Sequence, residues 1–261
     1  MIAARAGRRG PLVAELSALT ALWIVALLAV SLPVSETVAD ATVRGSVALM
    51  VTLWLGTVGY LLYSLPDPSV AGGSAPPWLG VANYLTLARA GLFCIVGGFV
   101  VVPPAGGLAW VPAICYGIGT VLDQLDGRVA RSVGRETPLG RRLDLAIDTF
   151  GFVVAPVVAV VWGQLPVWYL SLSAARYVYR GLTSLRRLRG RPLFERPDSD
   201  LGRYLAGGQM AFLTLVLTPI VTPGAAAAVA PLALAPSLGV FLRDYLFVAG
   251  HLPTGNDSLP Y

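Results

Sequence analysis

The sequence has 261 residues, of which 56% are hydrophobic and only 13% are charged. An ordinary soluble domain has about 25% charged residues, so this composition excludes a typical soluble protein and indicates a membrane protein. All 19 basic residues are arginine and the net charge is +5. In a membrane protein such an excess encodes topology more often than nucleic-acid binding, and we expect no nucleic-acid partner.

Eight apolar segments approach the roughly 20 residues that a helix needs to cross a bilayer. In chain order they are residues 16–34, 45–65, 85–102, 108–122, 145–162, 165–182, 204–221 and 225–242. Pro231 and Pro236 are expected to bend the last segment. The predicted fold class is therefore an all-α integral membrane protein.

A segment rich in Pro, Gly and Ser, residues 66–77, follows the second apolar segment and is typical of a linker. It predicts a two-helix membrane extension at residues 1–65, followed by a six-helix transmembrane core at residues 78–250. Residues 251–261 are then a C-terminal tail. The first apolar segment lacks a convincing signal-peptide cleavage site, so we expect it to be a retained helix.

The arginines predict the orientation in the membrane. With the N-terminus inside, the arginines at residues 5–9, 128–142 and 186–203 and Arg243 fall on one side, and only Arg44 lies near the other. This is the asymmetry of the positive-inside rule. We therefore expect a multi-pass protein of the cell membrane with both termini in the cytoplasm.

Four aspartates, Asp123, Asp126, Asp144 and Asp148, lie at the inner end of the fourth segment and at the start of the fifth. Charges at that depth are expensive in lipid and normally face a cavity, a partner or an ion. On helices, residues three or four apart share a face, so two helices could present all four carboxylates to one point. Mg²⁺ and Mn²⁺ prefer oxygen ligands and bridge carboxylates to phosphates. The pattern predicts a divalent-cation site, whereas a set of structural carboxylate–arginine pairs is the alternative.

The residues between the carboxylates suit a phosphate ligand. Gly127 permits close approach to the backbone, Ala130 keeps the helix face small, and Arg131 can pair with a phosphate. Thr137 could donate its hydroxyl, and Gly140 opens the next helix. These residues are candidate ligand contacts.

The string DQLDGRVARSVGRETPLGRRLDLAID, residues 123–148, resembles the D-x₂-D-G-x₂-A-R-x₈-G-x₃-D-x₃-D motif of the CDP-alcohol phosphatidyltransferases, with all eight fixed positions present. Residues 83–89, NYLTLAR, resemble the N-x-L-T-x-x-R segment of the same family, with Ala82 where the family has Pro. The resemblance covers about residues 78–250.

The resemblance implies that Asp123, Asp126 and Asp144 hold two divalent ions, Mg²⁺ or Mn²⁺, on the pyrophosphate of a CDP-linked donor. Asp148 would also touch a metal ion and act as the catalytic general base. The implied contacts to the CDP group are Asn83, Thr86, Gly127, Ala130, Arg131, Thr137 and Gly140. Asn83 could alternatively be a helix N-cap with Thr86 in the first turn. Homodimers are common in this family, so a homodimer is expected by analogy.

Further arginines lie near the inner ends of the sixth and seventh segments. Because an anionic acceptor needs a basic group, the candidate acceptor contacts are Arg176, Arg180, Arg187 and Arg203. Snorkelling to the interface is the alternative for Arg176 and Arg180, and topology or headgroup attraction is the alternative for Arg187.

The expected function is phospholipid biosynthesis: transfer of a phosphatidyl-type group, diacyl or archaeal ether, from a CDP-lipid to a small polar alcohol, with release of CMP. Glycerol 3-phosphate and inositol phosphate are examples of such an acceptor. A variant has a CDP-linked small alcohol as donor and a lipid as acceptor. A cation transporter that uses the aspartates as its ion site, and a scaffold with a relict site, are alternatives from other classes.

Overall fold

The computed structural model describes residues 2–65, 80–133, 138–194 and 200–252, and only the backbone of residues 2–13, 126–133 and 138. Within these ranges the chain is helical and contains no strand. The α-helices are α1 (Ile2–Ser35), α2 (Asp40–Ser64), α3 (Val81–Gly98), α4 (Val111–Val133), α5 (Pro138–Val161), α6 (Ser171–Leu188), α7 (Asp200–Val216) and α8 (Pro223–Val248). Two short 3₁₀ helices, η1 (Gly106–Trp110) and η2 (Val167–Leu170), precede α4 and α6. The predicted all-α fold is confirmed.

Six segments of the described chain are long and apolar enough to cross a membrane: 14–35, 40–64, 81–98, 106–125, 139–161 and 223–248. The protein is therefore a multi-pass integral membrane protein. The sixth and seventh predicted segments also form helices, α6 and α7, but they are not among the six. α7 has only 17 residues, and the sequence of α6 contains four arginines.

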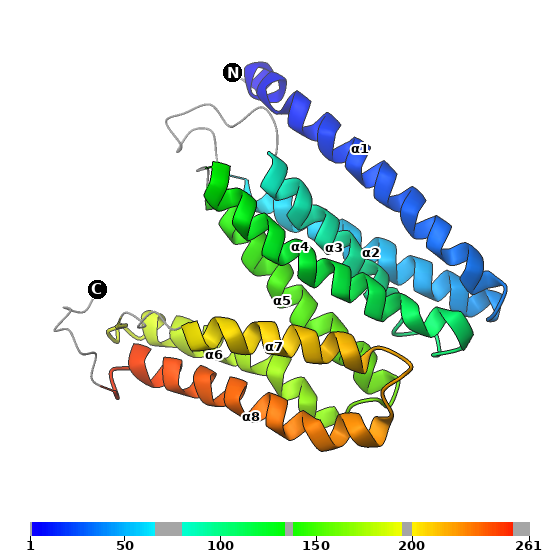
Figure 1. Ribbon diagram of the computed structural model, residues 1–261. Coiled ribbons are helices and arrows are strands. Elements are labelled where there is room, and N and C mark those ends of the chain that lie inside the picture. Colours follow the sequence, from blue (N-terminus) through cyan, green and yellow to red (C-terminus); the bar gives the residue numbers. More distant parts are fainter. Residues whose placement is uncertain (1, 66–79, 134–137, 195–199, 253–261) are drawn as a thin grey trace. The chain divides into compact units, whose positions relative to one another are not determined.

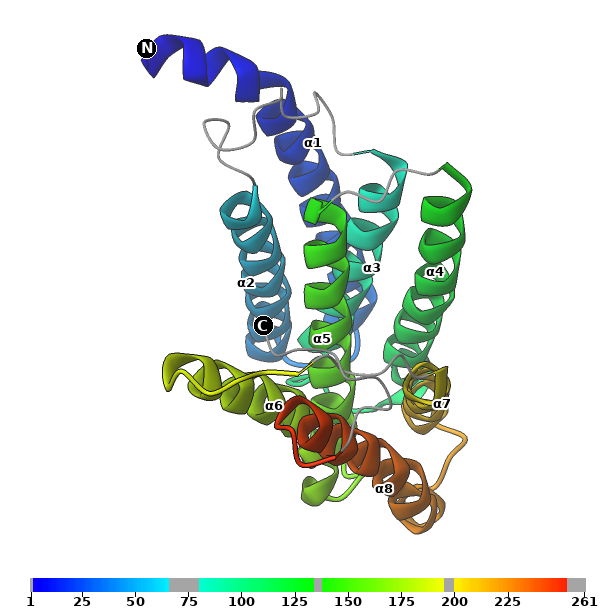
Figure 2. The ribbon, with the colours of Figure 1, turned by 90° about the vertical axis from the view of Figure 1, so that its left-hand side faces the viewer.

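The chain forms two compact units, Met1–Val158 and Ala159–Tyr261, with the division near the end of α5. In the first unit α3 lies between α2 and α4 and also contacts α1 (Figures 1 and 2). Twelve of the 18 residues of α3 are buried, so α3 is the central helix of this unit. The predicted linker, residues 66–77, lies outside the described residues, and the division into extension and core stays a prediction.

Helices α1, α2 and α3 meet at two tryptophans and a glycine. The rings of Trp23 on α1 and Trp54 on α2 have centroids 5.5 Å apart. A Cβ atom at Gly91 on α3 would lie 2.4 Å from the Trp23 ring. Only a residue without a side chain lets the indole pack this close to α3. The first two helices are thus packed directly against the central helix.

Phe93 joins α3 to both α4 and α5. A Cβ atom at Gly119 on α4 or at Gly151 on α5 would each lie 2.6 Å from the Phe93 ring, which therefore fills the space between these two glycines. Tyr116 on α4 also contacts the ring, with centroids 5.3 Å apart. Phe93 thus packs against α4 and α5 at the same level of α3.

In the second unit α6 and α7 both contact α8. A buried polar network links η2, α7 and α8: the Tyr169 hydroxyl donates to Gln209 Oε1. The Gln209 amide donates to the Ala233 carbonyl at 2.6 Å and to Ser237 Oγ at 3.0 Å. Arg186 Nη2 donates to the Ala249 carbonyl at 2.9 Å and joins the end of α6 to the end of α8. Tyr169 thus satisfies the amide oxygen of Gln209, and Ala233 and Ser237 satisfy its amide nitrogen, as burial requires.

Candidate active site

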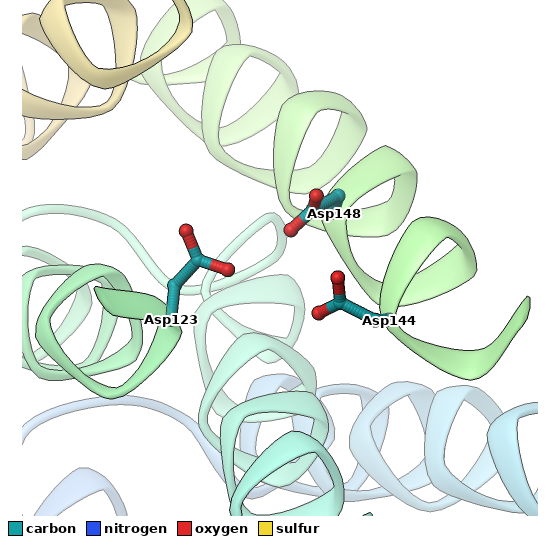
Figure 3. A group of neighbouring side chains, drawn as sticks. All are labelled: Asp123, Asp144 and Asp148. Carbon is teal, nitrogen blue, oxygen red and sulfur yellow. The ribbon is translucent and has the colours of Figure 1, made fainter. Parts of the chain in front are cut away.

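Three of the four predicted metal ligands come together in the first unit. Asp123 projects from α4, and Asp144 and Asp148 project from adjacent turns of α5. One carboxylate oxygen from each residue lies within 4.8 Å of the others, and Figure 3 shows the three side chains directed toward a common space. The predicted sharing of one face by Asp144 and Asp148 is therefore confirmed.

The carboxylates are partly open to solvent, with side chains 29%, 44% and 25% exposed for Asp123, Asp144 and Asp148. Like charges at this spacing repel by roughly 3 kcal/mol per pair at an effective dielectric constant near 20. The cluster therefore needs a positive partner.

Arg89 on α3 is one such partner. Its Nη1 donates to Asp123 Oδ1, and its Nη2 donates to Asp144 Oδ1 and Asp148 Oδ1, both at 2.8 Å. The Arg89 side chain is only 1% exposed, and burial of a charge is tolerated because the charge is paired. The guanidinium thus connects α3 to the carboxylates of α4 and α5.

Asp123, Asp144 and Asp148 also suit a hard divalent cation. Carboxylate oxygens are the ligands that Mg²⁺ and Mn²⁺ prefer, and three residues each offer one oxygen within a 4.8 Å group. Against one guanidinium these three carboxylates leave two negative charges, which match one divalent ion. The three described carboxylates thus fit one of the two divalent ions that the family resemblance implies.

The sequence model of one family, the CDP-alcohol phosphatidyltransferases, matches residues 79–239. The chain belongs to the CDP-alcohol phosphatidyltransferase family. Proteins described as "Putative cardiolipin synthase" from Mycobacterium bovis and from two strains of Mycobacterium tuberculosis are each 33% identical over 142 residues. The match covers 53% of this chain and 65% of each relative, so less than two thirds of the relatives' length is spanned.

Arg89 is the residue of the site to which sequence reasoning assigned no role. It stands at the last position of the segment that resembles the family's N-x-L-T-x-x-R pattern, and it is the one charged residue in α3. A lone charge within an apolar helix is itself a signal of a buried partner. The structural alternative predicts carboxylate pairs with the arginines at residues 128, 131, 135, 141 and 142, of which only Arg141 and Arg142 have described side chains.

Asn83 and Thr86 are both buried in α3. The interpretation of Asn83 as the N-cap is wrong, because α3 begins at Val81 and its N-cap is Gly80, which has a φ of 78°. Thr86 accordingly lies beyond the first turn, and its hydroxyl donates to the Ala82 carbonyl at 3.1 Å. Asn83 is therefore not used as a cap. Its role as a CDP contact stays a prediction from the family motif.

The remaining motif residues are described only in part. Asp126, Gly127, Ala130 and Arg131 lie in α4, in the part where the backbone alone is described. Thr137 lies outside the described residues. Gly140 is in the first turn of α5, as predicted.

The candidate acceptor arginines all lie in the second unit. Arg176 and Arg180 are one turn apart on α6, which gives them a common side of that helix, and Arg187 is near its end. Arg203 on α7 pairs with Asp200 at 3.0 Å, and both side chains are exposed, at 84% and 75%. Such an exposed pair contributes little to stability, and the role of Arg203 as an acceptor contact stays a prediction.

Proposed function

We propose that this protein is a membrane enzyme of phospholipid biosynthesis that transfers a phosphatidyl-type group from a CDP-lipid to an alcohol and releases CMP. The observation that carries the proposal is the gathering of Asp123, Asp144 and Asp148 within 4.8 Å, from the two helices that contain the family motif. The family match over residues 79–239 supports the same reaction class.

In this proposal Asp123, Asp126, Asp144 and Asp148 hold two divalent ions, Mg²⁺ or Mn²⁺. The family is generally dependent on divalent metals. When bound, the ions polarise the donor's phosphoryl group and stabilise the charge on the leaving CMP. Asn83, Thr86, Gly127, Ala130, Arg131, Thr137 and Gly140 are proposed to bind the CDP group.

Asp148 is proposed as the general base. Its carboxylate takes the proton of the acceptor hydroxyl as that oxygen forms a bond to the lipid-side phosphorus of the donor. The bond from this phosphorus to the oxygen of CMP breaks, and CMP departs with the electron pair. Asp148 is partly exposed, at 25%, so its carboxylate is open to an incoming alcohol.

The acceptor is proposed to be a small polar alcohol that carries phosphate, bound by Arg176, Arg180, Arg187 and Arg203. The relatives' name adds a second class of acceptor. Cardiolipin has two phosphatidyl groups on one glycerol, so a lipid-borne glycerol hydroxyl, as in phosphatidylglycerol, belongs in the acceptor panel. The active site and both termini are proposed to face the cytoplasm, and the protein is proposed to be a homodimer.

The test uses the purified full chain in detergent with CDP-diacylglycerol, Mn²⁺ or Mg²⁺, and a panel of acceptors. The panel contains glycerol 3-phosphate, inositol phosphate, serine and phosphatidylglycerol, and a reversed arm contains CDP-choline with diacylglycerol. CMP release and the lipid product are measured by mass spectrometry. We expect one acceptor to release CMP, EDTA to abolish the release and Mn²⁺ to restore it.

Asp148→Asn should lower the turnover at least about 100-fold, because a general base is worth 10²- to 10⁴-fold. Asp40→Asn is the matched control, since Asp40 is exposed at the start of α2. The absence of CMP release with every donor and acceptor from a folded protein would overturn the enzyme proposal. Cation uptake into vesicles without CMP release would favour the transporter instead.

A further inference from the structure

Arg89 is a charged residue at a buried position. It lies in the central helix α3, is 1% exposed and is the only charged residue of that helix. A buried guanidinium is expensive unless its charge is matched by carboxylates that accept its hydrogen bonds. Here the matching groups come from α4 and α5, which are 34 to 59 residues away in sequence.

The contacts use the geometry that distinguishes arginine from lysine. Nη1 binds the carboxylate of Asp123 on α4, while Nη2 is shared by Asp144 and Asp148 on α5, at 2.8 Å from each. A planar guanidinium presents these donors in a fixed fork, whereas an ammonium presents them from one point. The fork therefore reaches both helices at once.

These carboxylates are also the ones whose oxygens gather closely enough to hold a cation. A guanidinium and a divalent cation would thus be attracted to the same group of oxygens. Both are positive and repel each other, so the presence of either must weaken the hold of the other.

We propose that Arg89 is a positioning residue that holds Asp123, Asp144 and Asp148 together before the cation enters, and that it competes with the cation for them. The proposal rests on the proposed divalent-cation site and goes beyond it. Arg89 keeps the cation-free cluster assembled, and in return it weakens cation binding.

The experiment compares wild type with Arg89→Met, which retains the length of the stem and removes the charge. Melting is followed by tryptophan fluorescence of the full chain in detergent, in EDTA and at saturating Mn²⁺. In EDTA, Arg89→Met should melt about 5 to 10 °C below wild type, since it leaves carboxylates without their buried partner. Mn²⁺ should recover most of this loss, because the ion supplies the missing positive charge.

The Mn²⁺ dissociation constant is measured by electron paramagnetic resonance of the free ion. It should be about tenfold lower for Arg89→Met than for wild type, because the competing guanidinium is gone. Arg89→Lys should fall between the two in both measurements, since it keeps the charge and loses the fork. Should Arg89→Met fail to fold in either buffer, Arg89→Lys against wild type decides the question.

Arg243→Met is the matched control. Arg243 Nη2 pairs with Asp244 at 2.8 Å, in the second unit. The melting temperature of Arg243→Met should differ from that of wild type by the same amount in EDTA and in Mn²⁺. A loss for Arg89→Met that is also equal in both buffers, or an unchanged Mn²⁺ dissociation constant, would overturn the proposal and leave Arg89 a purely structural ion pair.

The outcome is separable from that of the proposed function. If Mn²⁺ binds wild type and responds to Arg89 as described while CMP is never released, the inference stands and the transfer reaction fails. If CMP is released but Arg89→Met leaves the Mn²⁺ dissociation constant unchanged, the inference alone fails. If wild type binds no Mn²⁺, both the inference and the metal site of the proposed function fail.

Discussion

Phe93 and Gly151 lie in such close contact that a Cβ atom on the glycine would stand 2.6 Å from the phenyl ring. Phe93 is one helical turn after Arg89 on α3, and Gly151 is three residues after Asp148 on α5. The apolar contact and the ion pair are therefore adjacent layers of the same helix packing. Because protein interiors are close-packed, we expect the distance between the charged groups to depend on how closely the ring fits the glycine.

Gly151→Ala is expected to destabilise the protein. The added methyl group must displace a ring that Gly119 confines on its other side, and such overpacking costs about 1 to 3 kcal/mol. CMP release should fall several-fold as α5 moves away from α3. Melting temperature and CMP release are both measured.

Gly207→Ala on α7 is the control, because a Cβ atom there meets nothing within 4 Å. It should keep or raise the melting temperature, since alanine favours a helix over glycine. Adding Phe93→Leu to Gly151→Ala should restore part of the lost stability. Full stability of Gly151→Ala alone would show that the ring does not set this spacing.

The contact of Trp23 with Gly91 predicts that α1 stabilises the central helix. Gly91→Ala should lower the melting temperature, because its methyl group would lie 2.4 Å from the indole ring. In the Trp23→Ala background the same change should be nearly neutral or favourable, and thermal unfolding of the four variants measures this coupling. If the effects of Gly91→Ala and Trp23→Ala are additive, the contact between these two residues does not couple α1 to α3. Gly59→Ala on α2, with open space around it, is the control.

The candidate acceptor arginines predict a selective change in KM. If the acceptor carries phosphate, Arg180→Gln and Arg176→Gln should each raise the KM for the acceptor about tenfold, because a charge-assisted hydrogen bond is lost. The KM for the CDP-lipid should change little. Arg44→Gln, which removes an exposed arginine of α2, is the control. Equal KM values for all three variants would assign Arg176 and Arg180 to the snorkelling interpretation.

The proposed orientation predicts which loops a membrane-impermeant maleimide can reach. Both natural cysteines are buried and should react slowly. Ala105→Cys, in the exposed connection before η1, should label in intact cells, whereas Arg189→Cys, after α6, should label only after permeabilisation. The positive-inside rule demands this order. The opposite pattern would place the aspartates on the outer side.

Much of this protein follows from local sequence alone. Hydropathy predicts a segment at each of the eight α-helices in the described part of the chain, because the apolar length of a segment is a property of that segment. Helical spacing likewise predicted that Asp144 and Asp148 share a face, since residues four apart lie on one side of any α-helix. The family membership was also visible in the motif at residues 123–148.

Other features depended on how the helices pack. The structure places the start of α3 at Val81, earlier than the apolar pattern predicts, and Gly80, with a positive φ, caps the helix rather than Asn83. The pairing of Arg89 with three aspartates was missed because these residues are 34 to 59 positions apart. The helical period within one segment does not determine which face of α3 meets α4 and α5. Only the tertiary structure decides that, because Phe93 on α3 packs between Gly119 on α4 and Gly151 on α5. The tertiary structure alone therefore shows that Arg89 is the positive group that the carboxylates contact.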